Sequence, residues 1–219
     1  EDYQRLHVPG GQSFRAQTYE VEPDASAASY FFAAAAITGG RVRINGLGRH
    51  SVQGDIHFVD VLGKMGCTVS WGDDYVEVVG PQQLRGVDID MESISDTAPT
   101  LAAIAPFADS TVTIRGIGHV RRKETDRIAA PVTELRRLGV QVEEYPDYMV
   151  IHPAAPHAGE VETYDDHRMA MSFALIGLRV PGITILDPDC TNKTFPGFFD
   201  LLDRVTLHDE KEDKKSHAG

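Results

Sequence analysis

The sequence has few cysteines, no long apolar run and no excess of positive charge. Its two cysteines, Cys67 and Cys190, form no CxxC pair, which argues against a zinc site and against a disulfide framework. The most apolar stretch, residues 30–37, is far shorter than the roughly 20 residues that cross a membrane. The net charge of −12 disfavours nucleic acid and anionic membranes as partners, although a local basic cluster can still bind a small anion.

The two ends of the chain carry little sign of packed structure. The first residues have neither the basic start nor the apolar core of a secretory signal, and we expect a cytoplasmic protein. Residues 206–219 mix both charges without apolar periodicity, so we expect a disordered tail. Between these ends, a 219-residue chain that is 42% hydrophobic has enough apolar surface for a sizeable core.

Three segments share one pattern, repeated about every 70 residues. Each begins with an aspartate before a helix of small and apolar residues, and continues into a strand that ends in isoleucine. The aspartates are Asp24, Asp96 and Asp166, and the strands end at Ile44, Ile114 and Ile185. The isoleucines are 70 and 71 positions apart, which indicates an internal repeat rather than chance similarity.

A second helix follows in each segment, and in the first two a hairpin comes after it. Gly66 and Gly139 are placed to end these helices, because glycine tolerates positive φ. The hairpins would turn at residues 72–74 and 146–147. The third segment stops after its second helix, residues 195–205. We therefore predict three βαβαββ repeats, the last one truncated, with its hairpin supplied by residues 1–18 or from outside this chain.

The first helix of each repeat is apolar on nearly every side, as residues 27–37 and 98–107 show. Such helices are buried, so we expect an α/β (α+β) body with pseudo-threefold repeats, helices inside and sheets outside. Their N-termini should meet at one end of the body, where the positive helix-terminal potential suits an anionic ligand.

The helix-start aspartates have a simple interpretation, because aspartate is a preferred N-cap. We expect capping at all three positions. Asp96 also suits chemistry, since the charged run Arg121–Arg127 lies about 27 residues beyond it. The spacing predicts that this run opens a helix, with Lys123 and Arg127 on one face and Glu124 beside them. Cations at a helix N-terminus oppose its dipole unless an anion binds there; the alternative is a solvated, salt-bridged helix start.

The third repeat adds a histidine and two cations. His167 and Arg168 start its buried helix, and Lys193 lies in a loop before the last helix. Arginine there suits a carboxylate or phosphate, and histidine suits acid–base work. Each has a plainer alternative: a structural histidine and a surface lysine. By pseudo-symmetry, we expect one site for a doubly anionic substrate, built from Asp96, Lys123, Glu124, Arg127, His167, Arg168 and Lys193.

Five stretches carry a close resemblance to the 5-enolpyruvylshikimate-3-phosphate (EPSP) synthase family, within a match over residues 19–205. They are Glu22-Pro-Asp-Ala-Ser-Ala-Ala-Ser-Tyr-Phe31, Ser51-Val-Gln-Gly-Asp55, Arg122-Lys-Glu-Thr-Asp-Arg127, Asp165-Asp-His-Arg-Met-Ala-Met171 and Cys190-Thr-Asn-Lys-Thr-Phe-Pro196. The resemblance implies two domains, each of three βαβαββ units, with the active site between them. It implies that residues 22–205 are the C-terminal domain, that residues 1–21 end the other domain and cross over, and that an N-terminal half is the partner.

The resemblance also implies a reaction and roles for single residues. Family members transfer the enolpyruvyl group of phosphoenolpyruvate to the 5-hydroxyl of shikimate 3-phosphate, without a metal or organic cofactor. Asp96, Glu124 and Lys193 would be catalytic. The implied substrate-binding residues are Lys123, Arg127, His167, Arg168 and His119. His119 departs from the family pattern, because many members have asparagine there.

Two alternatives remain beside this interpretation. One is transfer to a UDP-amino sugar, which the Lys-Glu-Thr-Asp-Arg motif disfavours. The other is a non-catalytic domain that acts as a folding or binding module. Because the resemblance places further substrate-binding residues in the N-terminal half, we expect this chain alone to have little or no turnover.

Overall fold

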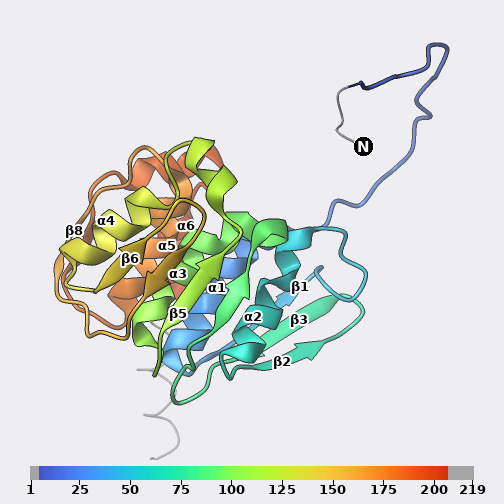
Figure 1. The fold of residues 1–219 in the computed structure, drawn as a ribbon. Helices are drawn as coiled ribbons and strands as arrows, with labels where there is room; N and C mark the ends of the chain where they lie inside the picture. Colours follow the sequence, from blue (N-terminus) through green and yellow to red (C-terminus); the bar gives the residue numbers. More distant parts are fainter. Residues whose placement is uncertain (1–4, 207–219) are drawn as a thin grey trace, which may run out of the picture.

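Three buried helices form the centre of the computed structural model, which describes residues 5–206 (Figure 1). They are α1 (Ala25–Thr38), α3 (Ala98–Ile104) and α5 (His167–Ala174), and α3 packs against both of the others. Every residue of α3 is buried, and α1 is buried from Ala28 to Ile37. The predicted buried helices are therefore confirmed.

Hydroxyl side chains mark the line along which these helices meet. Ser29 Oγ lies 3.4 Å from Thr100 Oγ1, which lies 3.2 Å from Ser172 Oγ. The three residues hold equivalent places in the repeats, 71 and 72 positions apart. Small residues let the helices approach closely, and each buried hydroxyl finds a partner in the neighbouring repeat.

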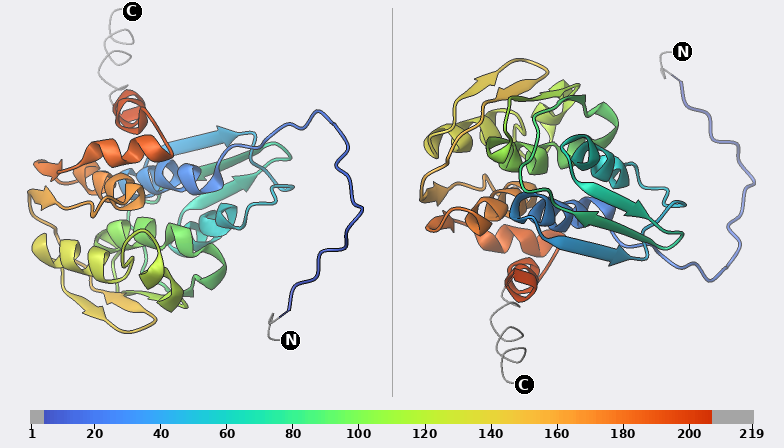
Figure 2. Two further views of the ribbon diagram at one scale, coloured as in Figure 1. Left: turned by 90° about the horizontal axis from the view of Figure 1, so that it is seen from above. Right: turned by 90° about the horizontal axis from the view of Figure 1, so that it is seen from below.

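Three separate sheets cover the helices from outside, as the views in Figures 1 and 2 show. The first has the antiparallel order β1-β3-β2 and the second the mixed order β4-β5-β7-β6, with β4 parallel to β5. The third contains β8 and β9 in parallel. The strands are β1 (Arg41–Asn45), β2 (Thr68–Trp71), β3 (Tyr75–Val79), β4 (Asp88–Asp90), β5 (Val112–Arg115), β6 (Val142–Glu144), β7 (Met149–Ile151), β8 (Gly159–Val161) and β9 (Ile183–Ile185).

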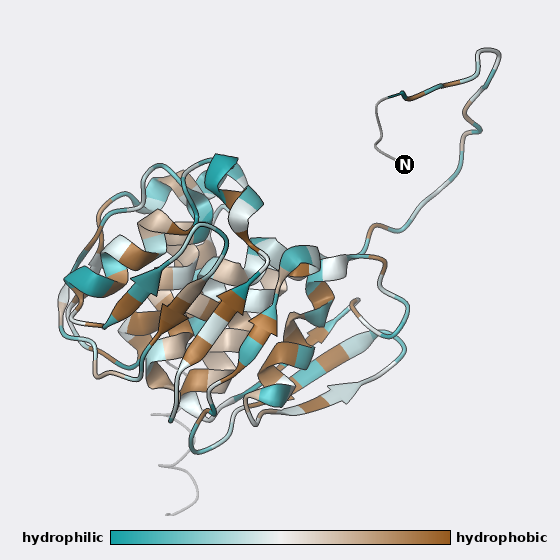
Figure 3. Cartoon of the chain, in the orientation of Figure 1, coloured by the Kyte–Doolittle hydropathy of each residue, from teal (hydrophilic) through white to brown (hydrophobic). Residues whose placement is uncertain are grey.

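Apolar residues are concentrated between the sheets and the central helices (Figure 3). The second helices of the repeats are α2 (Phe58–Lys64), α4 (Ala129–Arg137) and α6 (Phe198–Thr206). Short 3₁₀ turns connect the elements; they are η1 (Gly54–His57), η2 (Glu92–Thr97), η3 (Ala105–Phe107), η4 (Gly118–Arg122), η5 (Leu175–Leu178) and η6 (Pro188–Lys193). Within residues 5–206, no helix has the length and apolar character needed to cross a membrane.

Glycine ends two of the second helices, as predicted. Gly66 has φ 103° just beyond α2, and Gly139 has φ 85° just beyond α4. A side chain at Gly139 would also meet the His157 ring, since an added Cβ would lie 2.9 Å from it. Both predicted hairpins are confirmed, with β2 pairing with β3 and β6 pairing with β7.

The charged run 121–127 does not open a helix, and that prediction was wrong. Turn η4 ends at Arg122, Lys123 is extended, and α4 begins only at Ala129. The reason is Asp126, whose Oδ1 accepts hydrogen bonds from the backbone N–H groups of Ile128 and Ala129, both at 3.0 Å. This carboxylate satisfies two of the first donors of α4 and fixes the start of the helix beyond it.

The ends of the repeat array differ from the middle. The first sheet has no counterpart of β4 or β8 among the described residues, and the third has no hairpin among them. Residues 5–24 form neither helix nor strand. Residues 5–19 run away from the body (Figures 1 and 2), whereas Glu22 and Pro23 hydrogen-bond to residues 52 and 53. The described part of residues 1–18 therefore does not supply the hairpin. Of the predicted tail, residues 206–219, only Thr206 is described, and it is the last residue of α6. Residues 207–219 lie outside the described residues.

We predict that the isolated chain self-associates or has modest stability. Within the described residues, β1 and β9 each have one unpaired edge, and such edges pair readily with other strands. Size-exclusion chromatography and a thermal melt test this. Elution as a clean monomer together with a sharp, high-temperature melt would contradict the prediction.

Candidate functional site

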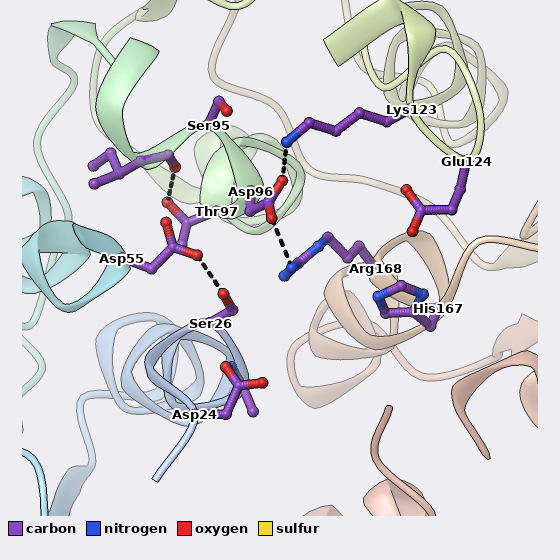
Figure 4. A network of polar contacts seen from close by, with 12 residues as sticks. Asp24, Ser26, Asp55, Ser95, Asp96, Thr97, Lys123, Glu124, His167 and Arg168 are labelled. Carbon is purple, nitrogen blue, oxygen red and sulfur yellow. Dashed lines mark hydrogen bonds and ion pairs between the residues drawn. The ribbon is translucent and has the colours of Figure 1, made fainter. Parts of the chain in front are cut away.

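The first turns of α1, α3 and α5 converge at one end of the body (Figure 4). Asp24 caps α1, since its Oδ1 accepts a hydrogen bond from Ala27 N at 2.9 Å. Asp166 caps α5, accepting from Arg168 N at 2.8 Å. The prediction of capping is confirmed for these two aspartates, and so is the convergence of the helix starts.

Asp96 does not cap its helix, so the capping prediction was wrong for this residue. It lies in η2, and no side chain caps the start of α3. Its carboxylate instead pairs with Lys123 Nζ, with Arg168 Nη2 at 2.9 Å and with Arg127 Nη1 at 3.3 Å. Figure 4 shows that Lys123, between η4 and α4, and Arg168, in α5, reach Asp96 from different elements. The Asp96 carboxylate is attracted more strongly by these three cations than by the N-terminus of α3.

Arg127 is almost fully buried in the cluster, with 1% of its surface exposed. Its Nε and Nη2 donate to the two carboxylate oxygens of Asp166, at 2.8 and 3.1 Å. Its Nη2 also lies 2.8 Å from Glu124 Oε2. One guanidinium thereby joins the second repeat to the third and holds three carboxylates around it, counting Asp96.

A second pair extends the cluster toward solvent. Lys193 Nζ, in η6, lies 3.2 Å from Glu124 Oε1. The side chain of Lys193 is 59% exposed and that of Glu124 is 35% exposed. The predicted residues of repeats two and three thus form one continuous chain of ion pairs from Lys193 through Glu124 and Arg127 to Asp96.

The two histidines lie beside this chain of ion pairs. His167 is almost fully buried, and burial lowers its pKa despite the opposing charge of Asp166. The imidazole is therefore neutral at pH 7, and its buried Nδ1 has no hydrogen-bond partner among the described residues. His119, in η4, lies on the other side, with Nε2 2.9 Å from Ser95 Oγ. Ser95 precedes Asp96, so His119 borders the cluster.

Both exposed carboxylates of the cluster are held ionised. Burial acts to raise the pKa of Asp96, but the hydrogen bond from Lys123 and the charges of Arg168 and Arg127 lower it further, and the net pKa is below its ordinary value. The pKa of Glu124 is also lowered. Burial acts to raise it, but its backbone hydrogen bond, Arg127 and Lys193 lower it by more. Two carboxylates and several fixed cations thus share one surface.

Asp55 also lies in this region, although the sequence analysis gave it no role in the site. It lies in η1 and receives a hydrogen bond from Ser26, in the first turn of α1 (Figure 4). Burial is the main reason that its pKa is raised, and the negative charge of Asp96 raises it further. Residues 51–55 contain both Asp55 and Gln53, and Gln53 Oε1 accepts a hydrogen bond from Ala25 N at 2.8 Å. The amide and the carboxylate in this stretch were the sequence signal that could have identified this part of the region.

The cluster occupies an open surface rather than a deep pocket. A cavity of about 30 Å³ beside Arg168 is lined by Tyr30 and His167. Two larger grooves, of about 640 and 670 Å³, lie elsewhere: one along β9 and α6, the other along β1 and α1. They follow the unpaired edges of the sheets and contain no member of the chain of ion pairs. Charge and geometry, not cavity size, therefore mark the site.

Removing Asp166 should destabilise the protein strongly, because it leaves the buried Arg127 charge without its main partner. We expect Asp166→Ala to lower the free energy of unfolding by about 3–5 kcal/mol in urea titrations. Asp88→Asn is the control, since Asp88 pairs with Arg115 on the surface and should matter little. Equal effects of the two substitutions would show that the buried pair is unimportant.

The stabilising effect of Asp96 should depend on pH. Its folded-state pKa is lowered, so its contribution is present above the unfolded value of about 3.9 and is lost as pH falls through the folded value. Asp96→Asn should therefore lower stability at neutral pH, and the difference from the unmodified protein should shrink below about pH 4. Urea unfolding at several pH values measures this; a difference that grows in acid would refute it.

Comparison with known proteins gives a consistent result. The family model described as EPSP synthase (3-phosphoshikimate 1-carboxyvinyltransferase) matches residues 1–202. A 3-phosphoshikimate 1-carboxyvinyltransferase from Nostoc punctiforme is 62% identical over 195 residues, covering 89% of this chain and 46% of the relative. One from Yersinia pseudotuberculosis is 53% identical over 208 residues, covering 94% and 48%.

Solved structures agree with these relatives. EPSP synthase from Acinetobacter baumannii superimposes with a TM-score of 0.75 at 29% identity, covering 84% of this chain and 46% of the other. The enolpyruvyl transferase NikO from Streptomyces tendae, at 24% identity and a TM-score of 0.68, shares the fold. The chain spans about half the length of the curated relatives that it matches. With its repeats, its motifs and this match over most of its length, the chain belongs to the EPSP synthase family.

Proposed function

We propose that this chain supplies the C-terminal half of an enzyme that transfers an enolpyruvyl group from phosphoenolpyruvate to the 5-hydroxyl of shikimate 3-phosphate. The observation that carries the proposal is the convergence of Lys123, Arg127 and Arg168 on Asp96. Fixed cations on one surface suit two anionic substrates, and the ionised carboxylates among them suit proton transfer. Family membership selects this reaction among those that such a surface supports.

Each of the two steps delivers one proton and removes one. In the addition, carbon 3 of the enol gains a proton, the 5-hydroxyl oxygen bonds to carbon 2 and loses its proton, and the resulting tetrahedral intermediate is anionic. In the elimination, carbon 3 gives up a proton and the carbon–oxygen bond to phosphate breaks, which restores the double bond; the leaving phosphate oxygen takes a proton, and inorganic phosphate is released. Preorganised cations lower the barrier, because they are already oriented toward the charge of the intermediate.

Asp96 is the proposed acceptor for the 5-hydroxyl proton. Its lowered pKa keeps the carboxylate ionised at neutral pH, so it can accept a hydrogen bond from the hydroxyl. Lys123 pairs with the same carboxylate, and we assign it a contact with the substituents of the shikimate ring. His119 borders this position through Ser95, and we assign it a contact with the same substrate.

Arg168 and Arg127 are the proposed partners of the phosphoenolpyruvate carboxylate, with the neutral His167 beside them. Because Arg127 is buried and paired, the substrate carboxylate would take the place of Asp96 or Glu124 in its contacts. Arg168 holds Asp96 through one Nη atom, while its Nε has no partner among the described residues. Lys193 and Glu124 are the proposed proton-transfer pair. Their 3.2 Å contact lets a proton pass between them, and Lys193 is exposed enough to meet the phosphate group.

The other wall of the site is proposed to come from a complementary N-terminal half. The chain covers only 46% of the Nostoc relative, and its charged cluster is open on one side. We assign residues 22–205 to the C-terminal domain and residues 1–21 to the end of the other domain and the crossover. A cytoplasmic location belongs to the same proposal. A UDP-amino sugar as acceptor has no support, since the matched family and relatives carry the shikimate name.

Phosphate release from phosphoenolpyruvate plus shikimate 3-phosphate tests the proposal. We expect no turnover with this chain alone and turnover when a separately expressed N-terminal half is added. In that mixture, Lys193→Met should lower kcat by about 10²–10⁴-fold, because it removes a proton-transfer group. Lys64→Met is the matched control, since Lys64 is exposed at the end of α2. If the mixture releases no phosphate although both halves are folded, the non-catalytic alternative is favoured.

A further inference from the structure

The turn that precedes α5 has an unusual backbone. Tyr164 and Asp165 have φ values of 56° and 55°, and within residues 5–206 they are the only residues other than glycine with positive φ. Such a conformation costs free energy for any residue with a β-carbon, most of all for a bulky one such as tyrosine. It persists only where surrounding contacts enforce it. The next three residues are Asp166, His167 and Arg168.

A buried carboxylate on α4 provides those contacts. Glu134 is fully buried, and its Oε1 accepts a hydrogen bond from the Tyr164 hydroxyl at 2.6 Å. Its Oε2 accepts from the backbone N–H of Glu162 at 3.1 Å, and Arg137 Nη1 lies 2.8 Å from Oε1. Burial is the main reason that the pKa of Tyr164 is raised, to about 12, so its hydroxyl keeps its proton and remains a donor.

We propose that Glu134 and Tyr164 are positioning residues that hold the left-handed turn and thereby place Asp166 and Arg168 in the site. This inference rests on the proposed function for its catalytic consequence, but its structural part stands by itself. Neither residue belongs to the chain of ion pairs, and both act through residues that do.

The connectivity explains why two attachments are needed. Arg127 and Glu134 belong to one segment, the loop that leads into α4 and the helix itself, and both hold the chain between residues 162 and 166. The Glu134 contacts fix the start of this stretch, and the Arg127–Asp166 pair fixes its end. Without the first attachment, the strained turn is free to relax, and Asp166 moves relative to Arg127.

The test begins with the spectrum of the chain itself. The Arg127 Nε–H group is buried and bonded to Asp166, so it should give a protected signal in ¹H–¹⁵N NMR spectra. We expect Tyr164→Phe to shift or broaden this signal. Tyr145→Phe is the matched control, because the Tyr145 hydroxyl donates to Glu143 at 2.8 Å on an exposed hairpin. It should leave the Arg127 signal unchanged.

Activity of the chain mixed with its N-terminal half gives a second readout. Tyr164→Phe should lower kcat/KM for phosphoenolpyruvate about tenfold, because a misplaced binding group disturbs the reacting geometry. Adding Asp165→Gly should restore part of the loss, since glycine adopts positive φ without a clamp. A general loss of packing would not be rescued in this way.

The outcomes separate this inference from the proposed function. If Tyr164→Phe keeps both the Arg127 signal and the kcat/KM of the unmodified protein, the positioning role is overturned, even if thermal stability falls. If the unmodified mixture shows no turnover, the proposed function has failed. The Arg127 signal alone then decides whether Glu134 and Tyr164 hold the turn.

Discussion

The site depends on one buried cation. The guanidinium of Arg127 lies inside the protein, where an unpaired charge would be prohibitively unstable, so carboxylates must surround it. Asp166 supplies a two-point contact, Glu124 a third contact and Asp96 a longer one. Because these carboxylates come from different repeats, one charge requirement fixes the relative positions of the second and third repeats at their helix starts.

The repeat explains why those helix starts meet, and the position that departs from it contributes to the charged cluster. Equivalent hydroxyls on α1, α3 and α5 hold the helices together along one line, so their first turns reach a common surface. Asp24 and Asp166 keep the capping role that this position favours. Asp96 instead pairs with Lys123 and Arg168, so the same position of the repeat belongs here to the cluster of ion pairs.

Periodic features were predictable from the sequence, and features that depend on distant contacts were not. The buried helices, the glycines after α2 and α4 and both hairpins follow from local pattern and turn chemistry. Helix α4 begins later than predicted. The spacing of the charged residues suggested a helix from residue 121, but the Asp126 carboxylate accepts hydrogen bonds from the backbone just beyond it, and the helix begins there. The three-residue strands β4 and β8 are too short for periodicity to reveal. The members of the charged cluster were predicted from their charge and from the symmetry of the repeats, but pairs such as Glu134–Tyr164 join positions 30 residues apart.

We propose that this surface carries half of a two-substrate site. A crystal structure of the chain assembled with its N-terminal half, with phosphate and shikimate 3-phosphate bound, tests this claim most directly. We predict the shikimate ring against Asp96 and Lys123, and the free phosphate beside Lys193. Substrates bound in the grooves along β1 or β9, with the charged cluster unchanged and facing solvent, would contradict it.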